Sequence, residues 1–261
     1  MQSKSLIAFI SALAISSASP LRRRCSNTTI PLTPTNPAPA PPAVTTPALP
    51  TTGSGTQLAG PGNSTLKHIL IGHGIQNYTC ASAGATASSI GALAVAWDIT
   101  SLSTSLSSAD FDALPSKVLR TTSMPLNLAT DGSGGADVSA PFPAPADLTI
   151  NGVQGAEDLK FMGHHFFDLA NTPTFDLTGA GDGELFKGKK DAGISAPADA
   201  DAGEDPATGA VDWLRLSDKG TSNGVSLVYR VLTAGGNPEA CTEAGQNQSI
   251  PYAAQYWVYS N

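Results

Sequence analysis

Charged residues are scarce in this sequence of 261 residues: they make up 13% of it, about half of the roughly 25% that is usual for globular proteins. This scarcity argues against a coiled coil or a long charged helix. Basic residues are outnumbered, 14 against 21 acidic ones, whereas nucleic acids and anionic membranes require a basic surface. No apolar run reaches the ~18 residues of a membrane-spanning helix. We therefore expect a soluble domain that does not bind nucleic acid and has no membrane-spanning helix.

The first 24 residues have the features of an export signal. A short positive start precedes an apolar stretch, Leu6 to Ile15, and the small residues Ser16 to Ala18. We therefore expect a signal peptide over residues 1–18 and a secreted protein, extracellular or attached to a cell wall. The basic run from Leu21 to Arg24 indicates a pro-segment with a processing site over residues 19–24, or else only a solvated charge cluster.

Residues 25–62 are rich in proline and threonine, with eight prolines between Pro31 and Pro50. Proline lacks a backbone donor and favours extended conformations in the residue before it. We expect a disordered stalk here, which carries O-glycans if the threonines are used. The folded domain then covers residues 63–261, enough for one core. Four N-glycosylation sequons agree with export; they begin at Asn27, Asn63, Asn77 and Asn247.

The chain has three cysteines, of which Cys80 and Cys241 lie in the folded domain. In an oxidising compartment two such cysteines usually pair. Closing so long a loop would stabilise the domain by roughly 4–5 kcal/mol through the lost freedom of the unfolded chain. Cys25 is then left free or forms an intermolecular bond, unless processing removes it.

Strand patterns dominate the domain. Alternating apolar and aromatic residues, bounded by glycine or proline, run through Val225–Thr233, Pro251–Tyr259, Leu159–Leu169 and Val211–Leu216. Ala83–Ala96 fits either a helix or a strand interrupted by glycine. We predict a mainly β fold, a single antiparallel β-sandwich with long loops rich in glycine and alanine.

The segment Gly72–Cys80, with the sequence GHGIQNYTC, resembles the Gly-x-Gly-Ile-Gln-x-Tyr-x-Cys signature of a family of fungal and bacterial secreted proteins of unknown function. Residues 64–260 are similar to this family, although its Trp-containing segment appears here only as Pro173–Asp176. The resemblance implies a Cys80–Cys241 disulfide but no reaction, and many members carry the label malate dehydrogenase. Further segments match in the family's order: Gly163–Phe167, Trp213–Leu216, Tyr229–Cys241 and Pro251–Tyr259.

That label can be tested on the residues. His68–Ile71 would be a strand, Gly72–Gly74 a phosphate loop, and Asp98 the acidic partner of the ribose. However, the third glycine position is Asn77, which begins a sequon, and Cys80 would form a disulfide beside the pyrophosphate. No alternation of strands and helices follows residue 100. We therefore expect no NAD, no other cofactor and no malate dehydrogenase activity.

Metal and hydrolase chemistry have little support. His73, His165 and Asp98 are the candidates for a metal site, but we predict that His165 is a buried histidine satisfied by a core hydrogen bond. His164 and His165 are successive residues of a strand, so they point to opposite faces. No Gly-x-Ser-x-Gly segment occurs. The acidic loop Asp199–Asp205 lacks the glycine and glutamate of a calcium loop, so we expect it to be solvated.

Two classes of function remain. The first is a non-catalytic binding or surface module, with cell-wall polysaccharide as its partner. Trp257, Tyr259 and Trp97 are its candidates for stacking on sugars, although we expect at least two of the three to pack in the core instead. The second is an extracellular enzyme of unassigned reaction with a polar pocket. Convergence of the pocket residues in one cleft would favour the enzyme, and their separation would favour the module. Those residues are polar positions in apolar strands: Gln76, His165 and Arg230.

Overall fold

The computed structural model describes residues 46–52, 55–181 and 183–261. The expected signal peptide, pro-segment and first part of the stalk, with Cys25 and Asn27, lie outside the described residues. No helix in the described part of the chain is long and apolar enough to cross a membrane.

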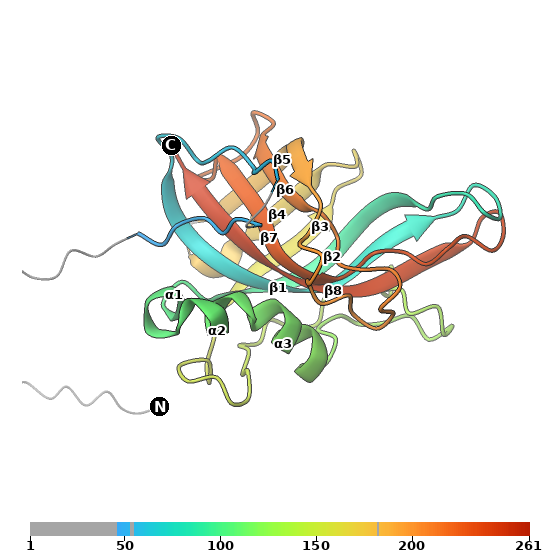
Figure 1. The fold of residues 1–261 in the computed structure, drawn as a ribbon, viewed down its shortest axis with the longest axis horizontal. Coiled ribbons are helices and arrows are strands. Elements are labelled where there is room, and N and C mark those ends of the chain that lie inside the picture. The colour runs from blue at the N-terminus through green and yellow to red at the C-terminus, as the bar shows by residue number, and fades with distance from the viewer. Residues whose placement is uncertain (1–45, 53–54, 182) are drawn as a thin grey trace, which may run out of the picture. The chain divides into compact units, whose positions relative to one another are not determined.

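Eight antiparallel strands form one closed barrel in which each strand pairs with the next and β8 pairs with β1 (Figure 1). The mainly β prediction agrees with this architecture, but the predicted sandwich is wrong, because the sheet closes on itself. Both architectures alternate inward and outward side chains along each strand, so the alternation did not distinguish them. The strands are β1 (Thr65–Thr79), β2 (Ser88–Asp98), β3 (Phe161–Phe167), β4 (Pro173–Leu177), β5 (Glu184–Ile194), β6 (Trp213–Asp218), β7 (Leu227–Gly235) and β8 (Asn247–Ser260).

Small residues on the inner faces of β1 and β2 make room for the barrel's large side chains. Gly72 and Gly74 of β1 have no space for a side chain, because a Cβ would lie 2.5 Å from the Tyr256 ring and 1.9 Å from the Leu93 carbonyl oxygen, respectively. The alanines of β2 at positions 92, 94 and 96 belong to the inner core, together with Phe175 and Phe186 from the other side of the barrel. The ambiguous segment is therefore a strand from residue 88 onward, and β2 continues to Asp98.

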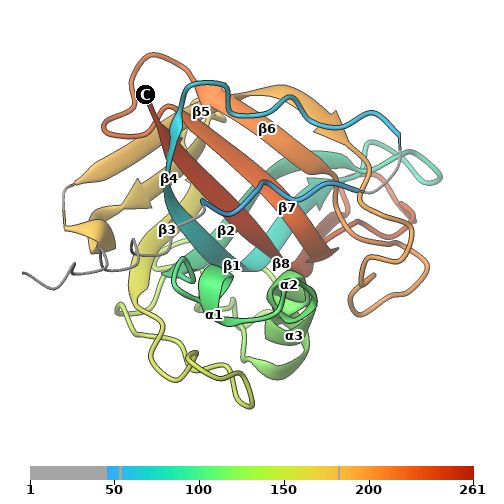
Figure 2. The ribbon, with the colours of Figure 1, turned by 60° about the vertical axis from the view of Figure 1, so that its left-hand side comes forward.

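A second core covers the outer face of the barrel, and three short helices contribute to it (Figure 2). They are α1 (Leu102–Ser105), α2 (Ser108–Asp112) and α3 (Leu114–Thr121), and a short 3-10 helix spans Thr178–Ala180. Of the three, α3 lies against β1, β7 and β8. Ser107 caps α2, since its side chain accepts a hydrogen bond from the Asp110 backbone nitrogen at 3.2 Å. The sequence analysis did not predict these helices.

Residues at the end of the expected stalk pack on the same outer face. Leu49 and Leu58 contact the outer core, and the Tyr229 hydroxyl donates a hydrogen bond to the Ala59 carbonyl oxygen at 2.6 Å. The segment has no helix or strand among its described residues. Packing onto the barrel therefore begins before residue 63.

A disulfide links Cys80, directly after β1, to Cys241 in the loop between β7 and β8, with Cα atoms 5.6 Å apart. It lies near the far end of β1, where that strand, β2 and β8 extend past the rest of the barrel (Figure 1). The bond therefore ties the β7–β8 loop to the end of this extension.

Candidate functional site

Gln76, His165 and Arg230 line one cavity of about 550 Å³ inside the barrel. They come from β1, β3 and β7, and all three are buried. Each of the three occupies an inward-facing position of its strand, and most of the other residues of that strand are apolar. The structure thus brings together the three residues that the sequence analysis named as a possible pocket.

Arg230 is the buried cation of the cavity, 9% exposed. Its Nε and Nη2 atoms donate hydrogen bonds to the Asp212 carbonyl oxygen at 3.1 and 2.9 Å. No carboxylate among residues 46–52, 55–181 and 183–261 forms an ion pair with it. Since Nη1 takes no part in the Asp212 contact, this side of the guanidinium remains available to another acceptor.

Gln76 supplies a second donor. Its Nε2 atom is buried and forms no hydrogen bond of acceptable geometry within the described part of the chain, although its amide lies close enough to Tyr252 to act on the pKa of that hydroxyl. A buried amide without a hydrogen bond is costly. The cavity therefore contains an unsatisfied donor as well as an unpaired cation.

His165 has a defined tautomer. Its Nδ1 atom lies 2.9 Å from the Thr174 carbonyl oxygen, which only accepts, so Nδ1 carries the proton and Nε2 is left as an acceptor. Burial lowers the pKa of His165 to about 4, with a smaller contribution from the charge of Arg230. The ring stacks on Phe175 with centroids 4.1 Å apart. At neutral pH this histidine is therefore uncharged.

Two tyrosines extend the polar region. The hydroxyl of Tyr256, which lines the cavity, lies 2.7 Å from that of Tyr252. Burial raises the pKa of both phenols. Both hydroxyls are therefore protonated at neutral pH and can donate hydrogen bonds.

The mouth of the cavity is cationic. Three exposed lysines line it, and together with Arg230 they make four cations against one carboxylate, that of Asp212. The chain as a whole carries a net charge of −7, so this local charge is opposite in sign to that of the protein. Sequence analysis missed these lysines because such residues on a strand or in a loop resemble ordinary solvated charges; they are Lys189, Lys190 and Lys219.

The structure separates the residues that were considered for a metal site. His73 lies on the outer face, with Nδ1 3.1 Å from Thr122 Oγ1, and His165 points into the barrel. No three histidine, cysteine, aspartate or glutamate side chains of the described residues gather as metal ligands would. The acidic loop instead holds α3, since Asp201 forms an ion pair with Arg120.

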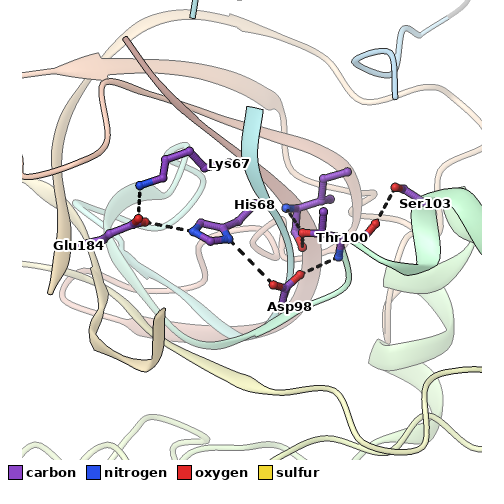
Figure 3. Close-up of polar contacts among 7 residues, drawn as sticks. Lys67, His68, Asp98, Thr100, Ser103 and Glu184 are labelled. Carbon is purple, nitrogen blue, oxygen red and sulfur yellow. Dashed lines mark hydrogen bonds and ion pairs between the residues drawn. The ribbon is translucent and has the colours of Figure 1, made fainter. Parts of the chain in front are cut away.

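Asp98 belongs to another polar cluster, near the start of β1 (Figure 3). The imidazole of His68 lies between two carboxylates. Its Nε2 atom is 3.2 Å from Glu184 Oε2, and its Nδ1 atom is 3.9 Å from Asp98 Oδ2. Lys67 also pairs with the buried Glu184. This cluster connects β1, β2 and β5 at the start of β1. The cavity lies towards the other end of β1, where Gln76 lines it.

The aromatic residues expected to stack on sugars are not at the surface. Trp97, Trp257 and Tyr259 are 5%, 1% and 4% exposed, and all belong to the outer core. The indole nitrogens of both tryptophans form hydrogen bonds inside the protein, to the Ala146 carbonyl and to Gln255. All three therefore pack in the core, as expected for at least two of them, and none offers a face to a sugar.

Gly72 and Gly74 form no phosphate loop, because β1 runs without interruption through both. Both glycines pair with β2 and β8, so their backbone amides are part of the sheet rather than of a turn before a helix.

No curated protein and no solved structure matches the chain significantly. A family model described as "Protein of unknown function (DUF3455)" matches residues 61–260, which include all eight strands and every residue of the cavity. The chain therefore belongs to the DUF3455 family.

Proposed function

We propose that this protein binds a small anion with an apolar body inside its barrel. The observation that carries the proposal is the buried guanidinium of Arg230, which has no carboxylate partner among the described residues, beside the unsatisfied Nε2 of Gln76. A buried charge is stable only when it is paired or well hydrogen-bonded. An oxyanion accepts hydrogen bonds from both groups, in competition with water.

The lining of the cavity supports an apolar body for this ligand. Phe167, Leu214 and Leu216 line it together with the ring of Tyr256. A volume of about 550 Å³ lies in the range of small-molecule sites, which combine apolar walls with a few polar groups. A flat polysaccharide chain would need exposed aromatic rings, and the three named for that role are buried.

The lysines at the mouth support an anionic charge. A cavity whose walls carry charge of one sign raises the local concentration of the opposite ion and speeds its association. Here Lys189, Lys190 and Lys219 would draw an anion towards Arg230 although the protein is acidic.

We infer that binding takes place outside the cell. The inference rests on the signal peptide expected at residues 1–18 and on the sequons, together with a disulfide, a bond typical of oxidising compartments.

Catalysis is the second candidate, because His165 offers an acceptor nitrogen in a cavity that also contains Arg230. Such a pair suits proton abstraction next to a carboxylate. A general base works best when its pKa lies near the working pH, however, and the pKa of His165 is about 4. The convergence of Gln76, His165 and Arg230 in one cavity is the outcome that the sequence analysis assigned to an enzyme. Because His165 is so weak a base at neutral pH, we nevertheless place binding first. Catalysis would take first place if NMR showed that the protein converts a bound carboxylic acid and that His165→Gln abolishes this conversion.

Two fluorescent probes with similar aromatic bodies test the proposal. One is 8-anilinonaphthalene-1-sulfonate, an anion, and the other is N-phenyl-1-naphthylamine, which is neutral. We expect both probes to bind the unaltered protein. Arg230→Gln should lower the affinity for the anionic probe roughly ten- to hundredfold, which corresponds to the loss of one charged hydrogen bond. The neutral probe should bind the variant unchanged.

Arg230→Lys keeps the charge and should retain part of the affinity for the anion. Lys160→Gln is the matched control, since Lys160 is an exposed cation outside the cavity, paired with Asp147 and Asp158. The proposal fails if neither probe binds, or if Arg230→Gln weakens both probes equally.

A further inference from the structure

A second cavity, of about 780 Å³, lies outside the first and is bordered by the extended ends of β1, β2 and β8 and by the loop of residues 129–141. Two of its lining side chains are apolar and unusually exposed, Ile90 at 49% and Val138 at 99%. Removing apolar side chains from water is favourable, so a group bound in this cavity would gain by covering them. We call this cavity the outer groove.

Two N-glycosylation sequons meet in the outer groove. They begin at Asn77 in β1 and Asn247 in β8, and both asparagines line it. The antiparallel register places Asn77 opposite Ser249 and Thr79 opposite Asn247. Each asparagine thus faces the hydroxyl residue of the other sequon, and Ser249 Oγ donates a hydrogen bond to Asn77 Oδ1 at 2.8 Å.

The two asparagines differ in their freedom. Asn77 is half-buried and holds Ser249, whereas Asn247 is exposed. The side chain of Asn247 forms no hydrogen bond with any residue that the structure describes. Asn247 lines the same cavity as Ile90 and Val138, so a glycan attached to it would begin beside these apolar side chains.

We propose that Asn247 carries an N-linked glycan whose first sugars lie in the outer groove and cover Ile90 and Val138. Its attachment needs a lipid-diphosphate-linked oligosaccharide as co-reactant. Nδ2 bonds to C1 of the first sugar, the bond from C1 to the diphosphate oxygen breaks, and the amide proton leaves with the lipid diphosphate. The apolar faces of the sugars then replace water over the groove. This proposal shares the assumption of secretion with the proposed function but does not involve the barrel ligand.

The experiment uses the full chain secreted from a eukaryotic host. Peptide mass mapping before and after enzymatic deglycosylation shows which asparagines carry a glycan. Asn247→Gln is compared with Asn63→Gln, a matched control, because Asn63 is exposed and lines neither the ligand cavity nor the outer groove. We expect Asn247→Gln to lower the thermal midpoint and to aggregate, as measured by light scattering, and Asn63→Gln to do neither.

A second substitution identifies the surface responsible. Val138→Ser in the Asn247→Gln background should restore solubility, because it removes the most exposed apolar side chain of the groove. The proposal is overturned if Asn247 carries no glycan, if the two asparagine variants behave alike, or if Val138→Ser leaves aggregation unchanged.

Discussion

Gly72 of β1 lies beneath the ring of Tyr256 of β8, so close that a Cβ on Gly72 would be 2.5 Å from Cε2 of the tyrosine. Tyr256 also lines the ligand cavity and contacts Tyr252 through its hydroxyl. The absence of a side chain at residue 72 therefore sets the position of a ring in the wall of the site.

Gly72→Ala should displace that ring and destabilise the domain by about 1–3 kcal/mol, as overpacking of a filled core does. The free energy of unfolding in urea measures the loss. Gly60→Ala serves as the control, because a Cβ at Gly60 meets nothing within 4 Å. Equal stability of the two variants would show that the barrel has room at residue 72.

Removing the disulfide with Cys80→Ser and Cys241→Ser together should cost about 4–5 kcal/mol, because the bond closes a loop with a sequence separation of 161. Urea unfolding of the double variant against the unaltered protein gives the value. Peptide mapping without reduction should recover the two cysteines as one linked pair. Two free thiols in the secreted protein would contradict the pairing.

Stability should fall as the pH falls from about 6.5 to 4. Burial lowers the pKa of His73 and of His165 to about 4, whereas an unfolded histidine takes up its proton near pH 6.5. The contribution of each is therefore complete above pH 6.5 and is lost towards pH 4, up to about 3 kcal/mol apiece.

The free energy of unfolding, measured at several pH values in this window, checks the sign and the size. His73→Asn and His165→Asn should each reduce the slope, whatever they do to stability at pH 8. His164, whose pKa is also lowered by partial burial, adds to the slope that remains. A flat profile in the unaltered protein would show that these imidazoles gain protons as easily when folded as when unfolded.

The protein should not bind NADH or oxidise malate. The Gly72-His-Gly74 segment is held in the barrel sheet on both sides, so it offers no backbone amides to a pyrophosphate. Titration of NADH fluorescence measures this, and saturation in the micromolar range would contradict it.

The sequence predicted best those strands whose two faces are both apolar. In β8 the alternation correctly placed Tyr252, Tyr256 and Val258 on one face and Trp257 and Tyr259 on the other, and these belong to the inner and outer cores. Strands β1, β4 and β5 were not among the predicted strands. In β1 the glycines at positions 72 and 74 interrupt the apolar pattern, and in β5 the segment GKKD exposes polar side chains and matches no alternating pattern. The closure between β1 and β8 is a long-range pairing that no local pattern encodes.

The polar centre of the site was predictable, but its entrance was not. Gln76, His165 and Arg230 stand out because each interrupts an apolar strand, and burial there requires a partner. In β3 the alternation failed at one point. A register shift at Ala96 and Trp97 of β2 places Phe161 in contact with the outer core although His165 points inward. The lysines at the mouth come from β5 and a loop, so only the folded barrel brings them together.

The pairing of β8 with β1 also determines when the fold can form. Strand β8 is the last of the eight to be synthesised, yet it forms both the seam with β1 and the pairing with β7. Until it arrives, β1 and β7 both have open edges, and open edges invite pairing with other chains. Contacts so distant in sequence also slow folding. A nascent or truncated chain without β8 would therefore be the form most exposed to aggregation, whereas in the closed barrel β1 and β7 are each paired on both sides.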